Sequence, residues 1–466
     1  MIRGLLAALL SVWAGTPVLA QEDPIPVEVS VRRDGEVWTA EFRFLEAAGV
    51  WAFTHSALTR VGERPWRPQS WTVETPGVRL ERHGYYDVLV ADDDRPVPRS
   101  VRVRFTPFPG DLLGEYDPAL IFTDGSVALY SEQFDAVPLA STAAAARLPI
   151  DLSTANIPFS RTRVTFRDAN GQVLNAGRRR AAVTLDDDAG TYVLFGPAQT
   201  IVTDDMAAII DPQLPSWIRE TLGRSVPDIL ARYAAALGPA PPPKPTIMVS
   251  WAGPTAGMTS MGGSVLPGLV VMAYEGTGVL QESPQGRAFG LWFIAHESAH
   301  FWLGNTVRYE FARDGWITEG GADLLAFRTV AAVDPGFNAR GALNDLIAEC
   351  VSLSRGRGIA TAQERNEQRA YYACGAVFAL VAEAASGRPF IAFVRDLIDT
   401  NREDGVVTRA EWLAMLDRVS DDRTLSRDIG VMLDRGAEDP KAAIASLFTR
   451  AGVAFARGED GMPRLQ

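Results

Sequence analysis

The sequence predicts a multidomain α+β protein, with an N-terminal all-β domain, a mostly helical domain that contains a small mixed sheet, and a short helical tail. Short runs of alternating apolar and polar residues, broken by turn signals, fill the first part of the chain. Longer helix-like segments dominate the second part, and only a few strand-like runs interrupt them. At 466 residues, with 47% hydrophobic and 22% charged residues, the chain is long enough for two or three domains with ample cores.

The β-rich part opens with a hairpin signal. The alternating run from Val27 to Val31 is followed by Asp34-Gly35, and a second alternating run extends from Glu36 to Phe44. An Asp-Gly pair between alternating runs favours a tight hairpin turn. Asp124-Gly125 and Asn170-Gly171 mark further turns. No helical period competes with these patterns, so we expect an all-β domain.

The second part begins with a predicted helix from Leu214 to Gly238 that kinks at Pro227. A strand is expected from Thr246 to Trp251, and the apolar run from Met261 to Glu275 is expected to form an edge strand that lines a cleft. The predicted division of the chain is a signal peptide at 1–20, a β-rich domain at 21–200, a mostly helical domain at 201–400 and a short helical region at 401–466.

The first twenty residues have the three parts of a signal peptide. Arg3 supplies a positive start, Leu5 to Val12 form a short apolar core, and Val18 to Ala20 provide a small-residue cleavage site. The core is too short to span a membrane, and no later stretch approaches the ~20 apolar residues that a span needs. We therefore expect an exported protein, periplasmic or secreted, without an integral membrane segment.

The strongest chemical signal is the sequence His296-Glu297-Ser-Ala-His300, within an apolar, proline-free segment that favours a buried helix. Positions i and i+4 lie on one face of a helix, so the two imidazoles can share one metal ion. A catalytic zinc usually keeps three protein ligands and a water, and Glu297 can take a proton from that water. The chain has only four histidines, so two core histidines at this spacing by chance are a poor alternative.

A second motif supplies the third ligand. Eighteen residues separate His300 from Glu319, and Asp323 follows Glu319 by one helical turn. Glu319 is therefore expected to bind the metal, while Asp323 accepts the N–H of a ligating imidazole and fixes its tautomer. The alternative for Asp323 is a solvated helix charge. Gly320 and Gly321 are poor helix formers, and they fit a place where two helices approach closely.

These two blocks resemble those of the gluzincin zinc metallopeptidases related to alanyl aminopeptidase and leukotriene hydrolase. The sequence from His296 to Asn305 is similar to that family's His-Glu-Leu-Ala-His-Gln-Trp-Phe-Gly-Asn, and Trp316 to Gly320 is similar to its Trp-Leu-Asn-Glu-Gly. The resemblance implies a thermolysin-like catalytic domain behind a β-rich domain, and one Zn²⁺ per chain. It also implies a peptide or protein substrate.

A third block resembles the family's Tyr-x-x-Gly motif, whose tyrosine stabilises the tetrahedral oxyanion. Tyr372 has the matching Gly375 three residues later. A phenol there can donate a hydrogen bond that strengthens as charge develops on the carbonyl oxygen. Core packing is the alternative for both tyrosines, and it is the preferred interpretation for Tyr371.

The sequence departs from the family at one place. Alanyl aminopeptidases carry Gly-Ala-Met-Glu-Asn before the first histidine, and its glutamate holds the substrate's α-amino group. Here Gly262 or Gly263 can begin the aligned, substrate-binding segment, and the glutamate position then holds Val265 or Leu266. An aliphatic side chain cannot pair with an ammonium group, and Glu275 lies far along the strand.

Cys350 and Cys374 are the only cysteines, and in an oxidising compartment they can form one disulfide or remain two buried thiols. The net charge of −12 argues against nucleic acid as a partner and does not select a substrate or an oligomeric state.

The sequence as a whole predicts an exported zinc peptidase, aminopeptidase-like but without the amine-binding glutamate. Two alternatives remain open. One is a zinc endopeptidase or other zinc hydrolase on the same scaffold, and the other is a catalytically silent, zinc-stabilised binding module. Glu297 argues against the silent module, because a purely structural zinc does not require it.

Overall fold

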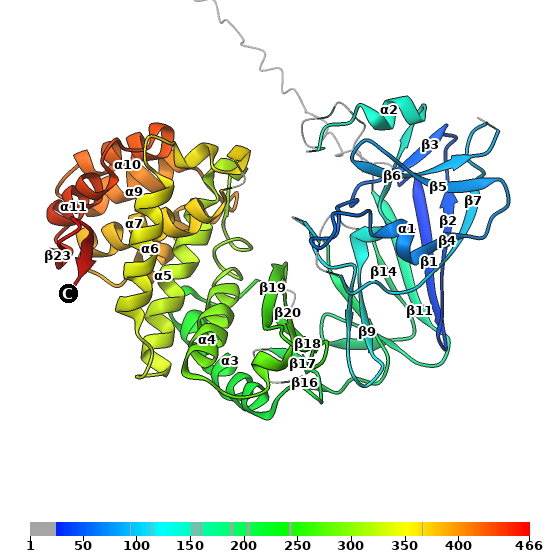
Figure 1. The fold of residues 1–466 in the computed structure, drawn as a ribbon, viewed down its shortest axis with the longest axis horizontal. Coiled ribbons are helices and arrows are strands. Elements are labelled where there is room, and N and C mark those ends of the chain that lie inside the picture. Colours follow the sequence, from blue (N-terminus) through cyan, green and yellow to red (C-terminus); the bar gives the residue numbers. More distant parts are fainter. Residues whose placement is uncertain are drawn as a thin grey trace, which may run out of the picture.

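A β-rich half and a helical half lie side by side in the computed structural model, and a small sheet lies at their junction (Figure 1). The structure describes residues 25–466 except 94, 111, 114, 151, 153, 154, 156, 158–160, 187–189, 203–205, 242–244 and 366. The predicted signal peptide, residues 1–20, lies outside the described residues. The predicted fold class is confirmed: an all-β region precedes a mostly helical one that carries a mixed sheet.

The described residues of the β-rich half form three sheets. The first has the order β14-β11-β1-β2-β7-β4, the second β10-β3-β6-β5 and the third β13-β12-β15-β9-β8. Their strands are β1 (Val27–Asp34), β2 (Val37–Phe44), β3 (Val50–Phe53), β4 (Trp71–Val73), β5 (Val78–His83), β6 (Tyr86–Ala91), β7 (Ser100–Phe105), β8 (Ala119–Ile121), β9 (Val127–Tyr130), β10 (Ala136–Leu139), β11 (Thr162–Asp168), β12 (Val173–Asn175), β13 (Arg178–Arg180), β14 (Val183–Leu185) and β15 (Tyr192–Phe195). Two short helices, α1 (Arg67–Ser70) and α2 (Thr142–Ala146), join them.

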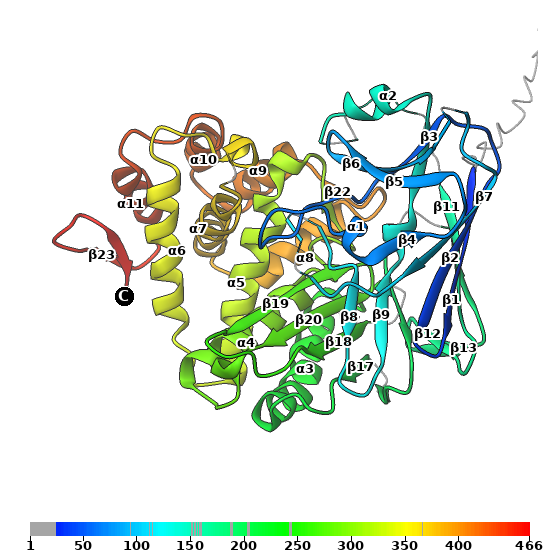
Figure 2. The ribbon, with the colours of Figure 1, turned by 45° about the vertical axis from the view of Figure 1, so that its right-hand side comes forward.

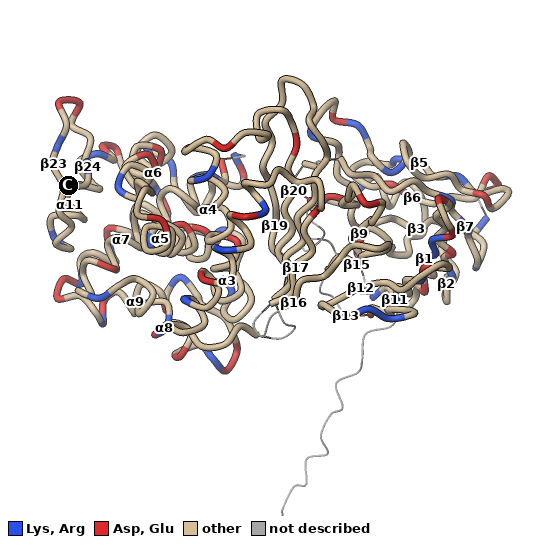
Figure 3. The backbone as a smooth tube through the Cα atoms, turned by 90° about the horizontal axis from the view of Figure 1, so that it is seen from below, with Lys and Arg blue, Asp and Glu red and all other residues tan. Residues whose placement is uncertain are grey.

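The predicted turns form where the sequence marks them. β1 and β2 pair antiparallel across Gly35, which has a φ of +62°, a value that glycine adopts without a steric penalty. Gly125, with a φ of +82°, turns the chain between β8 and β9. The basic run of β13 forms the edge strand of its sheet, seen in blue in Figure 3.

One buried cation organises the β-rich half. The guanidinium of Arg67 is fully buried and pairs with Asp87 at 2.9 Å. It also donates to the backbone carbonyls of His55 and Gln133, each at 2.8 Å. These bonds engage both terminal nitrogens of the guanidinium, so Arg67 fixes the positions of the segments that carry those two carbonyls.

The mixed sheet at the junction has the order β16-β17-β18-β20-β19. Its strands are β16 (Thr200–Val202), β17 (Ala207–Ile210), β18 (Thr246–Trp251), β19 (Ser260–Leu266) and β20 (Leu269–Glu275). The single edge strand expected over 261–275 is wrong: Pro267 and Gly268 turn the run back on itself, so that β19 and β20 form a hairpin and β19 alone is the edge. A Pro-Gly pair with φ +70° at the glycine fits a tight turn.

Among the residues that the structure describes, the helical half contains nine longer helices. They are α3 (Ser216–Leu237), which continues through Pro227, α4 (Pro284–Ala299), α5 (Trp316–Val333), α6 (Ala339–Leu353), α7 (Arg369–Ser386), α8 (Phe390–Thr400), α9 (Arg409–Val419), α10 (Thr424–Arg435) and α11 (Pro440–Ala451). Two short strand pairs complete it, β21 (Arg308–Tyr309) with β22 (Val406–Val407) and β23 (Phe455–Arg457) with β24 (Pro463–Leu465).

Within the described part of the chain, no one helix has both the length and the apolar character needed to cross a membrane. Only α7 and α8 taken together pass that test, and they are bent by 95° relative to each other.

The two halves share a hydrophobic core, so β8 and β9 lie beside β17 and β18 (Figure 2). This core joins side chains from the β-rich half, including Leu120 and Leu194, to side chains from the junction sheet, including Met248 and Leu266. Burial of apolar surface from both halves in one cluster favours a fixed arrangement rather than freely moving domains.

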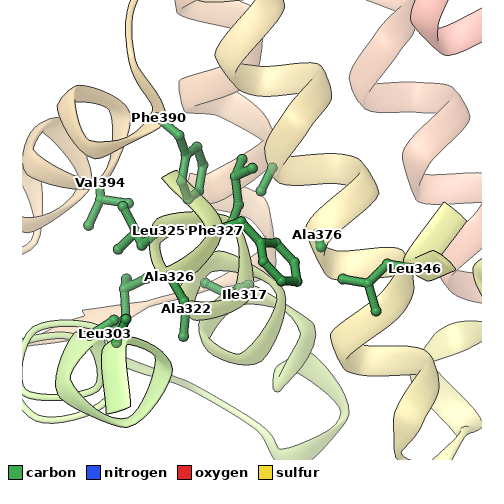
Figure 4. Packing of buried hydrophobic residues seen from close by; sticks show 14 of the residues in the cluster. Leu303, Ile317, Ala322, Leu325, Ala326, Phe327, Leu346, Ala376, Phe390 and Val394 are labelled. Atoms are coloured by element: carbon green, nitrogen blue, oxygen red, sulfur yellow. The ribbon is translucent and has the colours of Figure 1, made fainter. Parts of the chain in front are cut away.

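Helix α5 lies at the centre of the helical half. Its side chains pack against the segment after α4, against α6 and α7, and against α8; Figure 4 labels Leu303, Ile317, Ala322, Leu325, Ala326, Phe327, Leu346, Ala376, Phe390 and Val394. Cys350 of α6 and Cys374 of α7 form a disulfide, which resolves the alternative that the sequence leaves open.

Helices α5 and α7 cross at two glycines. A Cβ added to Gly320 would lie 2.1 Å from the backbone carbon of Gly375, and a Cβ added to Gly375 would lie 2.3 Å from the carbonyl oxygen of Trp316. No side chain fits between the backbones, so both positions require glycine. The close approach of two helices expected at Gly320 is therefore present.

We expect Gly320→Ala to destabilise the protein by about 1–3 kcal/mol, because the added methyl group meets backbone that cannot move aside. Gly223 in α3 is the matched control, since a Cβ there meets nothing within 4 Å. Gly223→Ala should instead stabilise by about 0.5–1 kcal/mol. Chemical denaturation of both variants measures this difference, and equal stabilities would contradict the tight crossing.

Candidate active site

Helix α4 carries the first two predicted ligands on its last turn. Ser283 caps its start by accepting from the backbone N–H of Gly286, and Pro284 occupies the first turn, where a missing N–H costs nothing. The helix ends at Ala299, with His300 as its C-cap. His296 and His300 are both buried, and their ring centroids lie 4.8 Å apart.

The structure brings His296, His300 and Glu319 together. The two Nε2 atoms lie 3.1 Å apart, and each lies 3.4 Å from Oε2 of Glu319. A tetrahedral zinc with bonds of 2.0–2.1 Å separates its ligand atoms by about 3.3 Å. The three atoms therefore already have the separations that one zinc ion requires.

Hydrogen bonds on the far side of each imidazole orient the pair. His296 Nδ1 lies 2.9 Å from Oδ1 of Asp323, and His300 Nδ1 lies 2.7 Å from the carbonyl oxygen of Leu303. Because both Nδ1 atoms face acceptors, they carry the protons, and both Nε2 atoms are left to face the ligand position. Asp323 is itself held by the indole N–H of Trp292 at 3.1 Å. Asp323 is fully buried, which contradicts the alternative of a solvated charge.

Two carboxylates in this site have opposite pKa shifts. Burial raises the pKa of Glu297, and the neighbouring histidines oppose that shift only in part. Glu319 is only partly buried by its exposed fraction, and the charge of His300 and hydrogen bonds from both histidines hold its pKa well below its usual range. Glu319 therefore remains an anion suited to a cation, while Glu297 becomes a stronger base.

Tyr372 lies on α7, one turn before the glycine crossing. Its ring stacks on His296 with centroids 5.7 Å apart and an interplanar angle of 17°. Burial and the charges of Glu319 and Glu297 raise the pKa of its hydroxyl, so the phenol stays protonated and can donate a hydrogen bond. Tyr371 points elsewhere: its ring lies against Gly315, and its hydroxyl lies 3.5 Å from the carbonyl of Ala360.

Strand β19 lies beside α4. Successive side chains of a strand point to opposite faces of the sheet, so the two positions where an amine-binding glutamate is expected face different sides. Val265 packs against the helical core, on the same side as Met261, whereas Leu266 belongs to the core shared with the β-rich half. Gly263 lies close over α4, where an added Cβ would come within 2.9 Å of the Phe293 ring. At Gly262 an added Cβ would meet nothing within 4 Å.

Glu275 does not approach Val265. The register pairs Glu275 with Ser260, at the end of the hairpin away from the turn, about 17 Å along the strand from Val265. The hydroxyl of Thr255 donates to its carboxylate at 2.5 Å.

The β-rich half contributes residues to this region that the sequence does not reveal. Tyr116 donates its hydroxyl to the carbonyl oxygen of Val265 at 3.0 Å, across 149 residues of sequence. Burial raises the pKa of Tyr116 to about 12, and the charges of Glu132 and Glu297 contribute to the rise. No local spacing could link these residues, because they meet only through the packing of the two halves.

Beside Tyr116 lies an acidic cluster made of Glu115, Glu132 and Asp135 around His55. His55 Nε2 lies 3.3 Å from Oε2 of Glu132, and Nδ1 lies 4.0 Å from Glu115. Burial opposes protonation of His55, but these carboxylates outweigh it and raise the pKa of the imidazole.

Comparison with solved structures identifies the fold. A two-domain M1 zinc metallopeptidase bound to L-tryptophan superposes with a TM-score of 0.50 at 15% identity, over 89% of this chain and 95% of that one. Leukotriene A4 hydrolase from Saccharomyces cerevisiae gives 0.51 at 12% identity, over 90% of this chain and 68% of that one. The same yeast enzyme with bestatin gives 0.51 at 12% identity, over 89% and 68%.

No family model matches the sequence, and no curated protein matches it in a sequence search. The solved structures show that the chain shares the fold of the two-domain M1 zinc metallopeptidase and of leukotriene A4 hydrolase, which is the fold that the resemblance of its motifs implies.

We expect the purified protein to bind about one Zn²⁺ per chain, because two imidazoles and one carboxylate leave a fourth position open. His300→Ala should lose the metal, and Asp323→Asn should weaken its binding about 10–100-fold. Glu297→Gln, the control, should keep the metal because this residue is not among the three ligands. Mass spectrometry after dialysis measures the zinc content of the wild type and of the three variants. Stoichiometric zinc in His300→Ala would refute the ligand assignment.

Proposed function

We propose that this chain is a zinc-dependent metallopeptidase that hydrolyses peptide bonds, with aminopeptidase-like character, and that it is exported. The observation that carries the proposal is the triangle of His296, His300 and Glu319, with the raised-pKa carboxylate of Glu297 on the same helix as the histidines. The M1 metallopeptidase fold supports the same reaction class. Export rests on the signal-peptide pattern of residues 1–20 alone.

Each side chain of the candidate site has a separate role in the proposed hydrolysis. Zinc held by His296, His300 and Glu319 would supply a water of lowered pKa and a Lewis acid for the scissile carbonyl. Glu297 takes a proton from the attacking water and delivers it to the leaving amine, a cycle suited to a carboxyl group whose pKa burial has raised. Tyr372 donates its hydrogen bond to the carbonyl oxygen as negative charge develops there.

A second candidate function is internal cleavage of peptides. Val265 lies on the side of β19 that faces α4, so this segment offers no carboxylate for a substrate's α-amino group. A charged amine buried without a partner costs several kcal/mol, so an aminopeptidase needs an acidic group elsewhere. Glu275 does not meet this need, because it lies at the other end of the hairpin.

Digestion of a peptide library, read by mass spectrometry, tests the proposed function. The zinc-loaded protein should cleave peptide bonds, and Glu297→Gln should lower turnover by about 10²–10⁴-fold while retaining the metal. Equal cleavage by both proteins would indicate a contaminating peptidase and remove the support for the proposal.

Tyr372→Phe should lower kcat by about 10²–10³-fold with little change in KM, because the hydrogen bond strengthens only in the transition state. Tyr371→Phe is the matched control, since its hydroxyl contacts a backbone carbonyl away from the metal ligands. Steady-state kinetics on one cleaved peptide measure both variants. Small and equal effects would assign both tyrosines to core packing.

Matched peptides with free and acetylated N-termini separate the two candidate functions. An aminopeptidase should prefer the free amine by more than about 100-fold, because acetylation removes the charge and adds bulk at the end of the substrate. Similar rates would support internal cleavage. Competition between the two peptides in one reaction, followed by mass spectrometry, measures the ratio of kcat/KM directly.

A further inference from the structure

Strand β19 presents alternate backbone groups to an open edge. Leu266 and Leu269 flank the two-residue turn of the hairpin, so they form its closing hydrogen-bonded pair. Bonded and outward-facing residues alternate along an antiparallel strand, so the N–H and C=O groups of Val265, Gly263 and Met261 face away from β20. No described strand pairs with this edge, and an extended peptide can therefore add to it.

Tyr116 already occupies one position on that edge. Its hydroxyl bonds the outward carbonyl of Val265, which confirms the direction of that group. Its ring lies 5.1 Å from the ring of Tyr130, which is buried in the β-rich half. The side chain is therefore a fixed obstacle that the β-rich half places on the edge of the helical half. The next outward-facing residue, Gly263, is exposed.

The surroundings of Tyr116 indicate which end of a peptide would meet it. The carboxylates of Glu115, Glu132 and Asp135 lie around the imidazole of His55. The neighbouring Arg67 and Arg82 both pair with Asp87. Three carboxylates gathered beside the Tyr116 ring favour an ammonium group over a carboxylate there.

We propose that Tyr116 is the specificity-determining residue that ends the peptide-binding edge at Val265, so that a substrate pairs with β19 only as far as Gly263 and its amino-terminal end stops against the Tyr116 ring. The enzyme then acts near the N-terminus because the cleft is closed, although Val265 provides no carboxylate. This inference rests on the proposed peptidase function. It assigns end-specificity to a side chain of the β-rich half rather than to an ion pair on β19.

A ladder of peptides tests the proposal. All members share one cleaved bond, identified by library digestion, and differ only in having one, two, three or more residues on its amino side. For the wild-type protein, kcat/KM should fall by about tenfold or more from the best short member to the longest, because added residues meet Tyr116. Tyr116→Ala should reduce this fall by about tenfold, whereas Tyr116→Phe should retain it because the ring remains.

Tyr192→Phe is the control variant. Tyr192 packs against Tyr130 in the same aromatic group, but its hydroxyl bonds the carbonyl of Asp117 at 2.6 Å and does not touch β19. For this variant, kcat/KM should fall with peptide length as it does for the wild type. If Tyr116→Ala does not fold, Tyr116→Leu is the substitute, because it shortens the side chain while keeping an apolar group in its place. It should also reduce the fall of kcat/KM with peptide length.

The outcomes separate this inference from the proposed function. Equal rates along the wild-type ladder, or an unchanged ladder in folded Tyr116→Ala, would overturn the role of Tyr116 and leave the peptidase function intact. Absence of cleavage of every member by the zinc-loaded wild type would overturn the peptidase function, and this inference with it.

Discussion

The contact of α5 with α7 at Gly320 and Gly375 is the constraint on which the candidate site depends. Glu319 precedes one of these glycines directly, and Tyr372 lies one turn before the other. Because the two backbones touch there, the Tyr372 ring reaches His296 and its hydroxyl reaches the vicinity of Glu319. A larger residue at either position would push the helices apart and separate the phenol from the three candidate metal ligands. The cysteine of α7 that forms the disulfide with α6 lies two residues after Tyr372. The disulfide therefore ties α7 to α6, while the glycine contact holds α7 against α5.

The site also concentrates charge in a buried region. Glu297, Glu319 and Asp323 lie with two histidines between α4 and α5, and all but Glu319 are fully or nearly fully buried. Carboxylates taken out of water are costly unless each has a partner. Here Asp323 has His296 and Trp292, and Glu319 has both histidines, whereas the pKa of Glu297 is raised instead. The arrangement is explained by function better than by stability, because apolar side chains would fill this space at lower cost.

The parts of the site that follow helical spacing are predictable from sequence. His296 and His300, and likewise Glu319 and Asp323, are each four residues apart, and helical geometry alone puts each pair on one face. The hairpin of β1 and β2 is predictable because Asp34-Gly35 fixes the turn between two alternating runs. The hairpin of β19 and β20 carries a comparable signal in Pro267-Gly268, but the apolar residues on both sides favour one continuous strand. The sequence alone does not decide whether the two cysteines form a disulfide, because it shows neither the redox state of their compartment nor the distance between their thiols.

What the sequence cannot supply is the contact between the two halves. Tyr116 and Val265 meet because a shared apolar core aligns β8 and β9 with the junction sheet, and apolar burial carries no local pattern that names the partner residue. The loss of a carboxylate at Val265, taken from the sequence alone, favours an enzyme without an anchor for the substrate's end. The three-dimensional arrangement allows a different interpretation. A side chain that blocks the edge strand can limit how far a peptide extends, even though it does not pair with the charged amine. In the proposed peptidase, end-specificity would depend on the packing of the two halves, and a change in the β-rich half would alter the choice of substrate without touching any of the three candidate metal ligands.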